Sequence, residues 1–143
     1  MISTGVRFVM IGGYAYNLYR NPRATGDIDF LVAADSDNES RLRSVLINFG
    51  FEGTLPESGK PLLEDGKVIM LGRAPFRIDL LTRIDGVDFD EVYTTRNEMT
   101  VDELLIPVIS PKTLIKNKRA AGRPKDIPDI LELQTWLESE PDN

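Results

Sequence analysis

The chain has no cysteine and no histidine among its 143 residues. The first absence excludes disulfides, thiolate zinc sites and cysteine nucleophiles. The second excludes Ser-His triads, imidazole metal sites and histidine general bases. Catalysis would therefore depend on carboxylates, lysines, tyrosines and hydroxyls, which favours metal-assisted phosphoryl chemistry.

Long apolar runs and a surplus of basic residues are also missing. No segment approaches the roughly 18 consecutive apolar residues of a membrane-spanning helix, and the first residues lack the basic and apolar regions of a signal peptide. We therefore expect a cytoplasmic chain that does not contact a membrane. The formal net charge of −6 argues against broad non-specific binding to nucleic acid, although it allows a local basic patch. The length predicts a single domain, residues 1–143.

A pair of glycines follows the first apolar segment. Residues 6–11 favour a buried strand, Gly12 and Gly13 end it, and the segment after them favours a helix. Because glycine has no Cβ, the backbone here can approach a ligand closely, and the first amides of the helix could receive phosphate oxygens. For a Gly-Gly pair taken alone, an ordinary turn is the more common explanation.

A second strand is predicted from Asp27 onward. Period-two alternation places Asp27 and Asp29 on one face and Ile28 and Phe30 on the other. Two adjacent carboxylates repel unless a cation lies between them. Hard oxygen ligands suit Mg²⁺, with Mn²⁺ as the alternative, and such an ion usually accompanies a nucleoside triphosphate. Taken alone, an Asp-x-Asp pair is more often a solvated strand edge.

The order of strand, glycines, helix and Asp-x-Asp strand, with Arg23 and Thr25 just before Asp27, forms a more specific pattern. It resembles the signature of the polymerase-beta-type nucleotidyltransferase superfamily. The sequence RATGDID, residues 23–29, most resembles the AbiEii-type toxins and similar small bacterial nucleotidyltransferases. In that superfamily a third carboxylate lies on a later strand.

The middle of the chain predicts one helix and several strands. Apolar residues at helical spacing predict a helix that ends at Gly50. Residues 67–71 and 76–82 predict a strand hairpin. Further short strands or edges are expected within residues 87–96 and 99–109.

Asp79 lies on the second strand of the predicted hairpin and shares a face with Arg77. Its neighbours Ile78 and Leu80 take the opposite, core face. The resemblance implies that Asp79 is the third carboxylate of the family. The alternative is an exposed strand aspartate that pairs with Arg77.

Two C-terminal helices are predicted. The first runs from Pro111 to about Ala121, with Ser110 as N-cap and proline in the first helical position. The second has an apolar face, formed by Ile127, Ile130, Leu131, Leu133, Trp136 and Leu137. Lys125, Asp126 and Asp129 near its start resemble a Lys-Asp pattern of similar proteins and are interpreted as structural ties at the helix junction. The predicted fold is α+β and nucleotidyltransferase-like, with helices packed on one side of a mixed β-sheet and the carboxylates on the other face.

The first C-terminal helix carries a basic stripe. Lys112, Lys116, Arg119 and, with some drift, Arg123 lie along it, and no acidic residue occurs between Ser110 and Lys125. Such a stripe is more often a solvated face. In this acidic chain, the missing acids and the resemblance together favour a triphosphate contact for Lys116.

The resemblance implies a metal-dependent nucleotidyltransferase, which moves an NMP from an NTP to an acceptor hydroxyl. In this interpretation the catalytic residues and metal ligands are Asp27, Asp29 and Asp79, and Asp79 also accepts the proton of the acceptor. The nucleotide-binding residues would be Gly12, Gly13, Arg23, Thr25 and Lys116. The cofactor would be Mg²⁺ or Mn²⁺.

The acceptor and the biological setting are open at this stage. The resemblance offers an RNA 3′ end, a protein hydroxyl or a small molecule such as an aminoglycoside. It also implies a toxin-antitoxin or phage-defence setting with a cognate partner protein. Two alternatives lack catalysis: a partner-binding module that keeps the fold, and a nucleotide-binding sensor. The presence of all three carboxylates and both glycines favours the enzyme, because a decayed site would have lost at least one.

Overall fold

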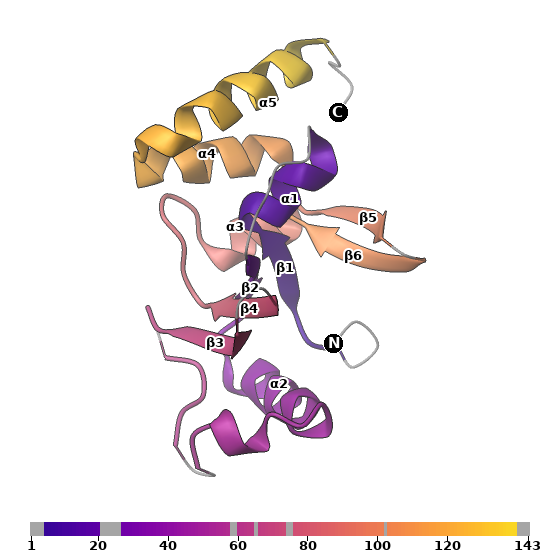
Figure 1. Cartoon of the computed structure of the whole chain (residues 1–143), viewed down its shortest axis with the longest axis vertical. Coiled ribbons are helices and arrows are strands. Elements are labelled where there is room, and N and C mark those ends of the chain that lie inside the picture. The colour runs from indigo at the N-terminus through magenta and orange to yellow at the C-terminus, as the bar shows by residue number, and fades with distance from the viewer. Residues whose placement is uncertain are drawn as a thin grey trace.

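The computed structural model describes residues 5–20, 27–57, 60–64, 66–73, 76–101 and 103–139. Its centre is a six-stranded sheet with the strand order β3-β4-β2-β1-β6-β5 (Figure 1). In chain order, the strands β1 to β6 are Phe8–Ile11, Asp27–Val32, Val68–Arg73, Phe76–Leu81, Asn97–Val101 and Leu104–Val108. Strand β1 pairs antiparallel with β2 and parallel with β6, while β2 pairs parallel with β4. The sheet is therefore mixed, as the sequence predicts.

Five α-helices accompany the sheet in the described part of the chain. In chain order, the helices α1 to α5 are Gly12–Tyr19, Ser36–Asn48, Phe89–Thr94, Pro111–Ala121 and Ile127–Ser139. Short 3₁₀ turns occur at Glu52–Thr54 and Pro124–Asp126. No helix among the described residues is both long and apolar enough to cross a membrane. The α+β class, the mixed sheet and the two C-terminal helices are confirmed.

Helix α3 lies where the sequence pattern predicted a short strand, within residues 87–96. Asp88 caps it, since its side chain accepts a hydrogen bond of 2.8 Å from the backbone N of Glu91. Val92 lies on the next turn and is fully buried. The strand prediction is wrong here because a capped helical turn with an apolar inner side outweighs the β-branched composition. The predicted strands within residues 99–109 correspond to β5 and β6.

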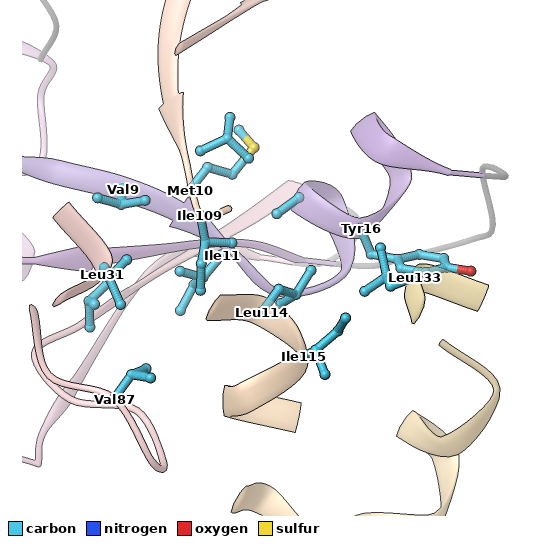
Figure 2. Packing of buried hydrophobic residues seen from close by; sticks show 13 residues of the cluster. Val9, Met10, Ile11, Tyr16, Leu31, Val87, Ile109, Leu114, Ile115 and Leu133 are labelled. Carbon is cyan, nitrogen blue, oxygen red and sulfur yellow. The ribbon is translucent and has the colours of Figure 1, made fainter. Parts of the chain in front are cut away.

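Helices pack against both faces of the sheet, whereas the sequence pattern placed them on one. Helix α2 covers the face of Phe8, Val32 and Leu80. The opposite face carries Asp27 and Asp29 at one end of β2 and becomes apolar further along the strand. The apolar side chains of this face pack with buried residues of α1, α3, α4 and α5 in a second cluster (Figure 2). This cluster includes Val9, Ile11, Tyr16, Leu31, Val92, Leu114 and Leu133. The carboxylates therefore lie at the margin of a helix-covered face.

A buried ion network joins α4 to α5. Lys118 is 4% exposed, and its Nζ donates to Asp126 Oδ1 at 3.2 Å and to Asp129 Oδ2 at 3.3 Å. Asp126 Oδ2 also accepts from Arg123 Nε at 2.7 Å. Burial acts to raise the pKa of Asp126, but the hydrogen bond from Arg123 and the charge of Lys118 bring it below its usual value. The structural role predicted for Asp126 and Asp129 is confirmed, with Lys118 as their shared partner.

We expect Lys118→Met to lower the free energy of unfolding by about 3 to 5 kcal/mol, because two buried carboxylates lose their shared ammonium. Urea unfolding followed by circular dichroism measures this difference. The exposed Lys112 lies on the same helix, and Lys112→Met should change stability by only about 0.5 kcal/mol. Similar midpoints for the two variants would show that the network contributes little.

Candidate active site

Asp27, Asp29 and Asp79 lie on the same face of two neighbouring strands. Strands β2 and β4 run parallel in a register that pairs Asp29 with Asp79 and Asp27 with Arg77. Residues paired directly across neighbouring strands project to the same side of a sheet. The fold therefore brings the three predicted carboxylates together, and it places Arg77 beside them.

Arg77 connects two of the carboxylates. Its Nε donates to Asp79 Oδ1 at 3.0 Å, and its Nη2 donates to Asp27 Oδ2 at 2.6 Å and to Asp79 Oδ2 at 3.2 Å. Asp79 is only 9% exposed. The alternative considered for Asp79 is therefore confirmed in its pairing with Arg77, and it is wrong in its exposure. Arg77 supplies positive charge to two acidic groups that would otherwise repel each other.

The pKa of Asp29 is raised to about 6. Burial is the largest cause, followed by the negative charges of Asp79 and Asp27 and a hydrogen bond with Asp79, while the charge of Arg77 acts in the opposite direction. A carboxyl group perturbed by burial and by two like charges is typical of functional sites. Asp29 is therefore the carboxylate whose charge is least compensated.

Gly12 approaches Asp29 closely. It begins α1 with a φ of +71°, in the left-handed region that favours glycine. A Cβ at this position would lie 2.7 Å from Asp29 Oδ2. The glycine pair predicted a close approach of this backbone to a ligand, and the structure shows a close approach to a carboxylate of the same site. Gly13 follows in the first turn of α1.

A cavity of about 290 Å³ opens beside Gly12 and Asp29. Its other walls come from the turn after β4 and from the end of α4. The charged and amide side chains that line it are Asp29, Arg83, Asp85, Asn117 and Arg123. Arg83 and Asn117 were not predicted as site residues, and Arg123 was predicted only as part of the basic stripe, because segments distant in sequence meet here only in the fold. The one signal in the sequence was the absence of acids between Ser110 and Lys125.

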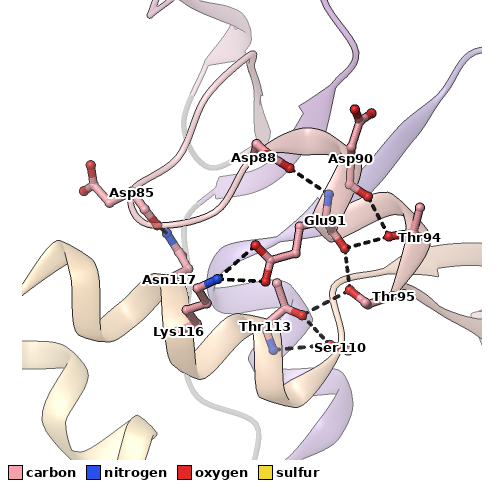
Figure 3. Close-up of polar contacts among 10 residues, drawn as sticks. All are labelled: Asp85, Asp88, Asp90, Glu91, Thr94, Thr95, Ser110, Thr113, Lys116 and Asn117. Atoms are coloured by element: carbon pink, nitrogen blue, oxygen red, sulfur yellow. Dashed lines mark hydrogen bonds and ion pairs between the residues drawn. The ribbon is translucent and has the colours of Figure 1, made fainter.

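Of the other predicted nucleotide contacts, Lys116 is not among the described residues that line this cavity. Arg23 and Thr25 lie outside the described residues. Lys116 Nζ donates to both carboxylate oxygens of Glu91, at 3.0 and 2.9 Å (Figure 3), and its neighbour Asn117 lines the cavity instead. The phosphate contact of Lys116 stays a prediction.

The donor set fits a divalent cation by its chemistry. Carboxylate oxygens suit Mg²⁺ or Mn²⁺. The pKa of Asp29 is raised first by burial and then by the negative charges of Asp79 and Asp27, and a bound cation would offset those charges. Across the described residues, no three acidic side chains converge closely enough to hold a metal ion. Arg77 bonds both Asp27 and Asp79. A metal ion held by all three carboxylates would therefore require Arg77 to release at least one of them.

Two solved structures share this fold. The first is an antigenic nucleotidyltransferase-like protein from Paracoccidioides brasiliensis, with a TM-score of 0.55, 17% identity, and coverage of 92% of this chain and 69% of that chain. The second is a candidate nucleotidyltransferase from Thermotoga maritima, with a TM-score of 0.56, 14% identity, and coverage of 97% and 86%. At these identities the likeness concerns the fold alone. It defines the class of the domain as nucleotidyltransferase-like.

The family follows from the sequence as a whole. The model of the family "Nucleotidyl transferase AbiEii toxin, Type IV TA system" matches residues 3–143. The chain belongs to this family and is a nucleotidyltransferase. A search of curated proteins found no match. The resemblance noted at Gly12, Gly13 and residues 23–29 is confirmed.

Proposed function

We propose that the chain transfers a nucleoside monophosphate from a nucleoside triphosphate to an acceptor hydroxyl, in a metal-dependent reaction. The site of this reaction is the face that carries Asp27, Asp29 and Asp79. The observation that supports it best is the pairing of Asp29 with Asp79 beside Gly12, at the start of α1. This arrangement offers carboxylates and helix amides to the same ligand.

Asp79 is proposed as the base. An acceptor hydroxyl is a poor nucleophile at neutral pH, and the chain has no histidine to take its proton. Asp27 and Asp29 would hold two Mg²⁺ ions, and Asp79 would also be a ligand of the first. The first ion would lower the pKa of the hydroxyl, and the second would offset the charge of the triphosphate. The two hydrogen bonds from Arg77 fix the orientation of the Asp79 carboxylate. Asp79 therefore offers a positioned proton acceptor on a rigid strand.

The start of α1 is proposed to bind phosphate oxygens. The first amides of a helix have no acceptor within the helix and lie at the positive end of its dipole. In α1 these amides begin at Gly12 and Gly13. Arg23, Thr25 and Lys116 are proposed as further nucleotide contacts.

The proposed acceptor is an RNA 3′ end or a protein hydroxyl. The type IV toxin-antitoxin family suggests a toxin-antitoxin or phage-defence setting and a cognate antitoxin as partner. With a net charge of −6, an RNA acceptor would depend on local basic groups rather than on the overall charge.

Labelled nucleotides test the proposed function. The purified chain is incubated with each of the four labelled triphosphates, with Mg²⁺ or Mn²⁺, and with either total RNA or lysate protein. We expect label on RNA or on protein with at least one triphosphate, and we expect it to be lost in EDTA and in Asp29→Asn.

The same assay separates the alternatives. Transfer that continues in EDTA would remove the metal from the proposal. Label that stays in the free nucleotide under every condition would contradict the transfer. In that case, binding of a triphosphate would indicate the sensor, and no binding would indicate the partner-binding module.

A further inference from the structure

We infer that a cavity at the end of α1 binds a nucleobase that carries an exocyclic amino group, with adenine as the best fit. Tyr19, Asn97 and Trp136 are among its lining residues. The cavity has a volume of about 490 Å³, which lies within the roughly 300 to 1,000 Å³ of small-molecule sites. The inference goes beyond the proposed transfer and does not depend on it.

The cavity lies apart from the proposed site of transfer. Its described lining comes from the end of α1, the start of β5, and from α4 and α5 (Figure 1). The carboxylates lie at the opposite end of α1, where Gly12 approaches Asp29. Between Gly12 and Tyr19 the helix rises by roughly 10 Å. The two cavities share no described lining residue, so this one has its own set of side chains.

Two aromatic rings form one wall of the cavity. The ring centroids of Tyr19 and Trp136 lie 5.8 Å apart, with the ring planes at 38°. The guanidinium of Arg20 lies 5.8 Å from the centroid of Trp136, and Arg20 Nε donates to Glu132 Oε1 at 3.1 Å. These contacts hold the indole in place. Aromatic side chains are the usual contacts for the face of a nucleobase.

Asn97 contributes an oriented amide. Its Nδ2 donates to Tyr19 Oη at 2.9 Å, and this hydroxyl donates to the backbone O of Ile109 at 2.8 Å. Burial raises the pKa of Tyr19 and outweighs the opposing hydrogen bond from Asn97, so the hydroxyl keeps its proton. Within the described part of the chain, Asn97 Oδ1 has no hydrogen-bond partner. Asn97 Oδ1 and the second hydrogen of Nδ2 therefore remain for a ligand.

The polar groups select the kind of base. An amide with one donor and one acceptor matches a base edge that offers an acceptor beside an amino group, as N7 and N6 of adenine do. Glu98 also lines the cavity, and only its Oε1 accepts from Arg96 Nε, at 2.9 Å. Its other oxygen suits an amino group, and its negative charge disfavours a phosphate inside the cavity. The lining therefore favours adenine over hypoxanthine.

Titration of the full chain with nucleosides in EDTA tests the inference. Trp136 is the only tryptophan of the chain, so its fluorescence reports a ligand in this cavity, and calorimetry gives the affinity. Adenosine and inosine form a matched pair, because inosine has a carbonyl oxygen in place of the amino group. We expect a saturable change in Trp136 emission and an affinity about 10-fold higher for adenosine than for inosine. Equal affinities for the two nucleosides would overturn the inference.

Three variants test the proposed contacts. Asn97→Ala should weaken adenosine about 10-fold and inosine by less than about threefold. Tyr19→Phe keeps the ring but releases the Asn97 amide, so it should reduce the preference for adenosine while inosine still binds. Asn48→Ala removes an exposed amide from α2, on the other face of the sheet, and should change neither affinity. Circular dichroism checks the fold of each variant. Unchanged adenosine binding in a folded Asn97→Ala would contradict the assignment.

Two further ligands identify the source of the base. Adenosine monophosphate and a short adenosine-rich single-stranded RNA are titrated in the same way. Binding of the nucleoside and the monophosphate would assign the cavity to a free nucleotide, whereas binding of the RNA alone would assign it to a base of a strand. Both results support the inference if Asn97→Ala weakens them. Failure of all these ligands to bind would overturn it.

Mg²⁺ and Asp29→Asn separate this site from the proposed transfer. We expect adenosine to bind equally well in EDTA, in Mg²⁺ and to Asp29→Asn, because the cavity contains none of the three carboxylates. If the change in Trp136 emission requires Mg²⁺ and Asp29, the base belongs to the donor nucleotide at the carboxylates. That result would overturn the inference and support the transfer. A chain that binds adenosine but transfers no nucleotide would contradict the proposed function alone.

Discussion

Gly12→Ala is expected to reduce nucleotidyl transfer by about 100-fold or more, the scale on which a displacement of roughly 1 Å affects catalysis. The added Cβ would lie 2.7 Å from Asp29 Oδ2, which is closer than carbon and oxygen atoms pack. Either the Asp29 carboxylate or the start of α1 must therefore move. Both are parts of the proposed site, so a shift of either one separates the carboxylates from the phosphate-binding amides.

Backbone strain alone would not produce this loss. Gly12 has a φ of +71°, and alanine in the left-handed region costs about 1 to 2 kcal/mol. Gly50 provides the matched control, because it also has a positive φ, +91°, while a Cβ there would meet open space. Gly50→Ala should lose a similar amount of stability and keep its transfer rate. A comparison of initial rates and unfolding curves for the two variants makes the distinction. If Gly12→Ala transfers as fast as Gly50→Ala, the contact with Asp29 is not important for function.

Local signals in the sequence were sufficient for much of the fold. Ser110 and Pro111 predict the start of α4, and the helix ends at Ala121 as expected, because Gly122 adopts a φ of +66° at its C-cap. Period-two alternation places Asp27 and Asp29 on one face of β2, and the structure agrees. These features depend on a few neighbouring residues, and no distant contact changes them.

Features that depend on tertiary packing were not predictable in the same way. Ile127 and Leu131 were expected on the apolar face of the last helix, yet they are 56% and 59% exposed, while Leu133 is fully buried. The helical pattern shows which residues are apolar, but the position of α4 decides which of them are covered. Packing also explains α3, a short capped helix in a segment where the sequence pattern predicted a strand.

The candidate site also combines features that follow from local sequence with features that depend on tertiary packing. Period-two alternation predicts which face of β4 carries Asp79. Its pairing with Asp29 also requires β4 to lie next to β2, and no local sequence pattern predicts that neighbour. The contact of Arg77 with Asp27 crosses between those strands and depends on the same adjacency. The cavity with Arg83 and Arg123 depends on the packing of a turn against α4. The face that carries the three carboxylates could therefore be predicted from the sequence and the resemblance. The arginines that surround it could not.

Asp79→Asn is expected to reduce transfer by about 10²- to 10⁴-fold, the range that a positioned base contributes, while binding of the Mg²⁺-triphosphate survives within a few fold. Asparagine keeps the size of the side chain and one oxygen that can accept from Arg77, so the local structure should persist. It removes the negative charge and the basicity that the acceptor proton requires. Single-turnover transfer and calorimetry measure the two quantities separately.

Two further variants serve as a comparison and a control for Asp79→Asn. Asp29→Asn should damage both binding and transfer, because Asp29 is the carboxylate whose charge is least compensated and it lines the same cavity as Gly12. Asp90→Asn removes one negative charge from an exposed position on α3 and should leave both quantities unchanged, which controls for the change in net charge. If Asp79→Asn instead transfers at a near-normal rate, the hydrogen bonds from Arg77 make Asp79 a structural partner within the sheet. The proton of the acceptor must then leave by another group, and the three-carboxylate mechanism is wrong for this protein.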